Sequence, residues 1–213
     1  VMYNDSATPE IEARLASMPE PWRSVMEPYV HAAAAEGAGI DPESRALLLG
    51  PRPKLGHYAH EICMFPPATR SELAQYEESL EVSLPMNVKA YLLAFNGGTF
   101  FEFSVWGADR FYTQHPRPTK DRPLWHCADI GTDLIIRRRR SSDAVPTLGA
   151  RNVTLNAVHH YFPYDDGVVA VDLHGNQAGS WPDMESWLKS EIAAAAAFTD
   201  EWSNAMAELL KAQ

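Results

Sequence analysis

The segment from Leu84 to Gly98, LPMNVKAYLLAFNGG, constrains the fold most, because a helix start, an apolar stripe and a glycine stop follow one another within fifteen residues. Pro85 has no backbone N–H and a fixed φ, so it suits the first turn of a helix. Apolar residues at helical spacing then predict one buried face: Val88, Tyr91, Leu92 and Phe95. Gly97 and Gly98 can adopt positive φ values, so we expect the helix to end there in a tight turn.

The segments on either side of this helix also have clear signals. Thr69 and Glu72 have the spacing of a capping box, which predicts a helix from Arg70 to Leu80. The aromatic stretch from Thr99 to Trp106 is rich in β-prone residues and predicts a strand.

The last third of the chain predicts a hairpin followed by a helix. Val168 to Leu173 alternates as a strand with a buried face, and Ala178 to Trp181 is the expected return strand after a turn at Gly175. A helix is predicted from Pro182 onward, either as one long helix or as two with Thr199 as the second N-cap.

Residues 1–65 are predicted to form a helical N-terminal region that packs on a main domain of residues 66–213. Two short helices fit residues 9–36, and Asp41-Pro42 has the pattern of an N-cap for a third helix that runs to Leu49. Short helices are marginal without tertiary burial, so we expect them to pack on the main domain. The predicted fold class is α+β, with a single antiparallel sheet flanked by helices.

The order of these motifs resembles the SUKH superfamily, which includes bacterial toxin-immunity proteins and fungal regulators of cell-wall synthesis. Six short segments carry the resemblance: Glu72 to Leu80, Leu84-Pro85, Tyr91-Leu92, Asn96-Gly97-Gly98, Asp166-Gly167-Val168 and Ala170-Val171-Asp172. The similar regions are residues 66–107 and 153–192. The resemblance implies an α+β fold and, from the bacterial members, a protein that neutralises a cognate toxin by occluding it.

Composition fits one sizeable core and a protein without membrane spans. The chain has 213 residues, of which 46% are hydrophobic, and it has no apolar run long enough to cross a bilayer. Its first residues are polar and acidic, unlike an export signal, so we expect a cytoplasmic protein. Cys63 and Cys127 cannot form a disulfide framework for a chain of this length, and reduced thiols are expected.

The net charge of −10 is unevenly distributed along the chain. Residues 1–36 and 183–213 each carry six acids and two bases, whereas residues 110–151 carry nine bases and four acids. An acidic chain repels phosphate backbones, so nucleic acid is not an expected partner. A basic protein, such as a nuclease toxin, would be attracted to the acidic surface, although solubility alone also explains such a charge.

Candidate chemical groups do not converge on a catalytic motif. His57, His60 and Cys63, with His126-Cys127 elsewhere, are the available zinc ligands, but spacings of three residues rotate them away from one another on a helix and onto opposite faces of a strand. Neither cysteine lies in a nucleophile motif, and no glycine-rich phosphate loop is present. Arg137 to Arg140 fits either an acidic ligand or a solvated strand end. We therefore expect no metal, no cofactor and no catalytic residues.

The aromatic-rich segment suggests a partner-binding surface. Between Phe100 and Tyr112 there are more aromatic side chains than one strand face can bury, since side chains alternate between faces. We expect some of them to be exposed beside an acidic turn and to anchor a partner: Trp106, Phe111, Tyr112, Asp165 and Asp166. The alternative is that both faces of this strand are covered and the aromatics are core.

Three functions remain open from the sequence. The first is an immunity-type protein that binds a cognate bacterial toxin. The alternatives are a regulatory scaffold that binds housekeeping partners through the N-terminal helices, and a metal-dependent enzyme that uses His57, His60 and Cys63. The sequence predicts neither the oligomeric state nor the identity of the partner.

Overall fold

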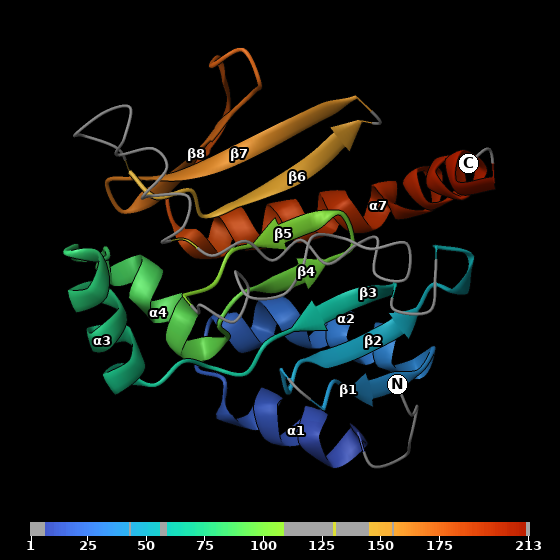
Figure 1. Ribbon diagram of the computed structural model, residues 1–213, viewed down its shortest axis with the longest axis horizontal. Coiled ribbons are helices and arrows are strands. Elements are labelled where there is room, and N and C mark those ends of the chain that lie inside the picture. The colour runs from blue at the N-terminus through green and yellow to red at the C-terminus, as the bar shows by residue number, and fades with distance from the viewer. Residues whose placement is uncertain are drawn as a thin grey trace.

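A computed structural model describes residues 7–42, 44–55, 59–108, 130, 145–154 and 156–211 (Figure 1). The described strands form one nine-stranded antiparallel sheet whose spatial order, β1 to β9, is the order of the chain. Every strand therefore pairs with its neighbours in sequence. The predicted α+β fold with a single antiparallel sheet flanked by helices is confirmed.

The first five strands are β1 (Ala38–Ile40), β2 (Leu47–Pro51), β3 (His60–Met64), β4 (Gly98–Phe100) and β5 (Phe103–Val105). The last four are β6 (Gly149–Thr154), β7 (Ala157–Tyr164), β8 (Gly167–Val171) and β9 (Gln177–Trp181). The α-helices are α1 (Ala7–Ser17), α2 (Trp22–Ala35), α3 (Arg70–Leu80), α4 (Met86–Ala94) and α7 (Met184–Lys211), and a short 3₁₀ helix is η1 (Pro53–Leu55).

The main core lies between one face of the sheet, called the inner face here, and helices α2 and α7, which lie on the same side of the sheet in Figure 1. Alternate residues of the central strands point into this core and are fully buried: Leu47, Leu49, Ile62, Phe100, Phe103 and Tyr161. Helix α1 packs beside α2 and β1, and α3 and α4 lie together at one end of the sheet. The opposite face is called the outer face below.

Local signals set α3 and α4 as predicted. The Glu72 N–H donates to Thr69 Oγ1 at 3.2 Å and the Thr69 N–H donates to Glu72 Oε2 at 2.6 Å, which completes the capping box. Helix α4 begins directly after Pro85, and Gly97 has a φ of +81° in the turn that follows it. Gly98 is instead the first residue of β4, where it lies close to the backbone of β3.

The predicted helical character of residues 1–65 is wrong at residues 38–40, 47–51 and 60–64, which form strands. Helices α1 and α2 are confirmed, but the segment expected as a helix up to Leu49 forms β1, a turn and β2, and β3 follows. Asp41 accepts hydrogen bonds from the backbone and side chain of Ser44. The residue that was predicted to be a helix N-cap therefore stabilises a turn. Leu48 is buried on the outer face while its neighbours are buried on the inner face, and burial on both faces favours a strand. The sheet thus crosses the predicted boundary between residues 65 and 66.

The segment predicted as one strand from Thr99 to Trp106 forms the two-stranded hairpin β4–β5. Phe101, with a φ of +57°, and Glu102 form the turn. Phe100 and Phe103 are cross-strand neighbours on the inner face, and both are fully buried. Because Phe100 and Phe103 lie on two paired strands, both can point into the core. On one continuous strand, residues three apart would point to opposite faces.

The C-terminal part follows the sequence prediction closely. Strands β8 and β9 form the expected antiparallel hairpin, with Gly175 at a φ of +84° in the turn. The helix that follows is one continuous helix of 28 residues, and Thr199 lies within it.

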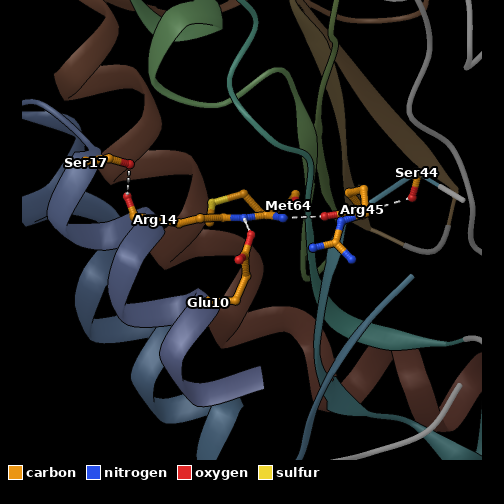
Figure 2. A network of polar contacts seen from close by, with 7 residues as sticks. Glu10, Arg14, Ser17, Ser44, Arg45 and Met64 are labelled. Carbon is orange, nitrogen blue, oxygen red and sulfur yellow. Dashed lines mark hydrogen bonds and ion pairs between the residues drawn. The ribbon is translucent and has the colours of Figure 1, made fainter. Parts of the chain in front are cut away.

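Arg14 connects α1 to the sheet. Its side chain is 8% exposed, pairs with Glu10 at 2.9 Å and donates to the carbonyl oxygens of Met64, at the end of β3, and of Arg45. Figure 2 shows the Arg14 side chain reaching from the helix past Glu10 toward Arg45. A buried charge therefore has three acceptors and fixes α1 against the loop before β2.

We expect the two glycines after α4 to be intolerant of alanine. A Cβ on Gly97 would lie 2.7 Å from the Gly107 nitrogen at a positive φ, and one on Gly98 would lie 2.4 Å from the Cys63 oxygen. Gly97→Ala and Gly98→Ala should each lower the free energy of unfolding by about 3 kcal/mol. Gly175→Ala is the control, because Gly175 has a positive φ but nothing within 4 Å of its Cβ position, and about 1 kcal/mol of strain is expected. Equal losses in all three variants, measured by urea denaturation, would contradict the close approaches.

Candidate functional site

The acid pair predicted to bind a partner forms the turn between β7 and β8. Asp165 and Asp166 are both exposed, and Asp165 has a φ of +49°, a conformation that Asp tolerates better than most residues. The Asn87 side chain, at the start of α4, donates a hydrogen bond to the Asp166 carbonyl at 2.9 Å. The acidic turn is therefore held by a second element and presents two carboxylates at a defined place.

An open groove of about 880 Å³ extends from this turn along β8 and β9. Its wall combines the acid pair with the exposed Tyr164, the half-buried Val169 and Trp181, and the exposed polar residue Ser180. Val169 and Ser180 are cross-strand neighbours on the outer face, while Val168 and Ala170 of the same strand point into the core. The groove is thus the outer side of the hairpin whose inner side builds the core.

A third carboxylate lies at the other end of the hairpin. Asp172 accepts hydrogen bonds from the side chain and backbone of Asn176 and from the backbone of His174. The bonds from Asn176, with a smaller effect from His174, hold the pKa of Asp172 below its usual range. This turn therefore keeps a negative charge at neutral and mildly acidic pH.

Charge in this part of the chain has one sign. Residues 152–188 contain five acids and neither lysine nor arginine: Asp165, Asp166, Asp172, Asp183 and Glu185. The groove is built from this segment, and its wall contains no lysine, arginine or histidine among the described residues. Its field therefore favours a cationic ligand or the basic surface of a protein.

The structure does not bring the predicted aromatic anchors to this groove. Trp106 is half-buried, packs against the main core and lies outside the groove wall. Its carbonyl accepts a hydrogen bond from the Tyr91 hydroxyl at 2.8 Å. Phe111 and Tyr112 lie outside the described residues. Tyr164, 69% exposed, is the aromatic side chain of the groove that faces solvent, and sequence reasoning missed it as a binding residue. Trp181 also lines the groove, but its indole packs on the core side, with its ring centroid 5.8 Å from that of Tyr161.

The candidate metal ligands do not converge in the described part of the chain. His60 and Cys63 lie three residues apart on β3, so their side chains point to opposite faces of the sheet. Burial raises the pKa of the Cys63 thiol, which disfavours the thiolate form. No group of three potential ligands occurs among the described residues. His57, His126, Cys127 and Arg137 to Arg140 lie outside them.

A buried polar cluster beneath the hairpin was also missed by sequence reasoning. Glu191 of α7 is 3% exposed and accepts hydrogen bonds from Arg151 Nε on β6 and from the Tyr161 hydroxyl on β7. Burial and the adjacent carboxylate raise the pKa of Tyr161, so the phenol stays protonated and remains a donor. Trp187 and Phe103 surround Tyr161 with ring centroids 5.3 to 5.6 Å apart. The only signal in the sequence was an acid at an apolar position of the last helix.

Comparisons with known proteins give no assignment for this arrangement. No family model, curated protein or solved structure matches the chain. Within the described residues, no helix combines the length and apolarity needed to span a membrane.

We expect Glu191→Ala to destabilise the protein strongly, because it leaves the Arg151 charge and the Tyr161 hydroxyl unpaired in a largely buried site. A loss of about 3–5 kcal/mol in the free energy of unfolding is the usual cost of such a change. Tyr161→Phe, which removes one donor and keeps the ion pair, should cost about 1–3 kcal/mol. Glu201→Ala, at an exposed position of the same helix, is the control and should stay within about 0.5 kcal/mol of the wild type. Similar values for Glu191→Ala and Glu201→Ala would show that the cluster does not hold the helix.

We also expect the purified protein to contain less than stoichiometric zinc, because His60 and Cys63 face opposite sides of β3. Elemental analysis of protein purified without chelator tests this. A full equivalent of zinc that disappears in Cys63→Ala would overturn the expectation.

Proposed function

We propose that this chain is an immunity-type binding protein that neutralises a cognate bacterial toxin by occluding it. The observation that carries the proposal is the acidic groove on β8 and β9, with the exposed Tyr164 beside the acid pair. Aromatic side chains next to charged ones are typical of protein interfaces, and the uniform sign of the charge favours a basic partner. The resemblance of the segment from Leu84 to Gly98 to immunity proteins supports the same class.

Binding explains the site better than catalysis does. The two adjacent carboxylates lie in a hairpin turn, and the described groove wall offers neither a histidine base nor a thiol beside them. Glu191, the buried acid on the helix that contacts β8 and β9, is already paired with Arg151 and Tyr161 and supports the fold. A surface that offers charge and aromatic area without a reactive pair suits recognition of another protein.

The proposed mechanism is electrostatic attraction followed by steric occlusion. Acids at both ends of the β8–β9 hairpin would raise the rate of encounter with a basic toxin, and this effect weakens as salt is added. Tyr164 and the half-buried Val169 and Val171 would then supply apolar contact area. In this proposal the chain acts in the cytoplasm of the cell that must be protected.

The test uses a variant that removes charge and preserves the turn. Asp165→Asn with Asp166→Asn keeps side chains that tolerate a positive φ at the first position. The control is Asp200→Asn with Glu201→Gln, which removes the same charge from an exposed adjacent pair on α7. The wild-type protein captures its partner from host lysate, mass spectrometry identifies the partner, and calorimetry measures the affinity of each variant for the purified partner.

We expect the groove variant to bind the partner about tenfold more weakly than the control variant at low salt, with a smaller difference at high salt. Expression of the partner alone should stop growth, and coexpression of the wild-type chain should restore it. A partner that does not affect growth would contradict the immunity function. Equal affinity of the two variants would place the interface away from the groove.

A further inference from the structure

Strand β9 forms one edge of the sheet, and its only strand partner in the described structure is β8. An edge strand has backbone N–H and C=O groups without partners in the sheet, and proteins usually protect such edges with lysine, proline, bulges or very short strands. At the other edge, β1 has three residues and packs beside α1. Strand β9 has five residues, reads QAGSW, and contains neither a charge nor a proline. Among the described residues, the protection of this edge is limited to one bulge in its pairing with β8, contacts with α7, and Pro182 directly after the strand.

The register shows which groups point outward. Gly149 faces Val105 next to the hydrogen bond from the Trp106 N–H to the Leu148 carbonyl, so Gly149 belongs to a non-hydrogen-bonded pair. A Cβ on Gly149 would lie 2.2 Å from the Ser104 oxygen. A Cβ added to Gly167 would lie in the same way 2.1 Å from the Trp181 oxygen of β9. Gly167 therefore also occupies a non-hydrogen-bonded position.

By the same geometry, Val168 and Trp181 form a hydrogen-bonded pair and Val169 and Ser180 form the next, non-hydrogen-bonded pair. In such a pair the backbone groups of the edge residue point away from the neighbouring strand. The N–H and C=O of Ser180 are therefore directed to the free edge of β9, beside the groove whose wall includes the Ser180 side chain.

The charge around this edge selects the occupant. Asp165 and Asp166 flank the end of β9 at Trp181, because their turn leads into Gly167, whose Cβ position lies next to the Trp181 carbonyl. Asp172 lies at the other end, in the turn that leads into Gln177. Between them the outer face offers the half-buried apolar side chains of Val169 and Val171. An extended segment that alternates basic and apolar residues fits this pattern.

We propose that the basic partner binds as an extended strand that pairs with the free edge of β9 and extends the sheet by one strand. This inference rests on the proposed function, because it specifies how the same site takes its partner. Backbone hydrogen bonds to Ser180 would supply much of the affinity, and the acids at the two ends would select basic side chains.

The test uses the intact protein and defined peptides. The probe is acetyl-Lys-Val-Lys-Val-Lys-Val-amide, and its charge control replaces each lysine with glutamate. Two further isomers carry N-methyl groups on the three lysines or on the three valines, so that each blocks the donors on one edge of the peptide and leaves its charge unchanged. The readouts are the amide chemical shift and the hydrogen-exchange rate of Ser180 in labelled protein.

Strand addition predicts that the lysine peptide slows exchange at Ser180 by about fivefold or more, and that the glutamate peptide does not. It also predicts that one N-methylated isomer loses this effect while the other keeps it, because only one edge of the peptide faces β9. Equal binding of both isomers would show electrostatic attachment alone and would overturn strand addition, while leaving the proposed function in place. Slow exchange at Ser180 in concentrated protein without peptide would identify a second copy as the occupant and would also overturn it.

The two proposals fail in distinguishable ways. If the peptide pairs with β9 but the captured partner does not affect growth, the immunity function fails and the strand-addition site stands. If the partner is a neutralised toxin and neither peptide isomer changes Ser180, strand addition fails and the immunity function stands.

Discussion

The buried carboxylate of Glu191 determines how the long C-terminal helix sits on the sheet. A charge removed from water costs several kcal/mol unless its partners are in place, and here the partners come from two adjacent strands, Arg151 on β6 and Tyr161 on β7. Rotation of α7 about its axis would leave that charge unpaired. The helix is therefore fixed against the inner face, and the core that it closes includes Trp187 and Phe103.

The packing of α7 on the inner face also determines which side chains line the groove. Successive side chains of each hairpin strand point to opposite faces, so those that do not pack under α7 lie on the groove side. Val168 and Ala170 are buried against the helix layer, whereas Val169 and Val171 face the groove and are half-buried. The acids lie in the turns at the ends of these strands, where Asp suits positive φ and accepts local hydrogen bonds. The aspartates that suit these hairpin turns therefore also place negative charge at both ends of the groove.

Sequence reasoning succeeded for elements that are determined by local signals. It failed for elements that are determined by burial between segments distant in the sequence. The capping box at Thr69 gave the bounds of α3, and alternation gave β8 and β9, because neighbours in sequence make those contacts. Strand β2 was missed because burial of Leu48 on the outer face depends on Cys63 and Phe65 across the sheet. The acid pair was found from its turn, but the groove needs the register of β7, β8 and β9, and the Arg151–Glu191 pair joins residues 40 positions apart.

The same acids give a physical reason against self-association through the edge strand β9. Two copies that paired antiparallel through β9 would place the acid pair of one copy, at its Trp181 end, beside Asp172 of the other. Like charges at both ends of the new ladder oppose this pairing, and each charge that opposes a second copy attracts a basic segment. Lysine on the strand, the usual protection of an edge, would repel such a segment. Carboxylates in the flanking turns would instead favour basic segments over a second copy of the chain as the strand that pairs with β9.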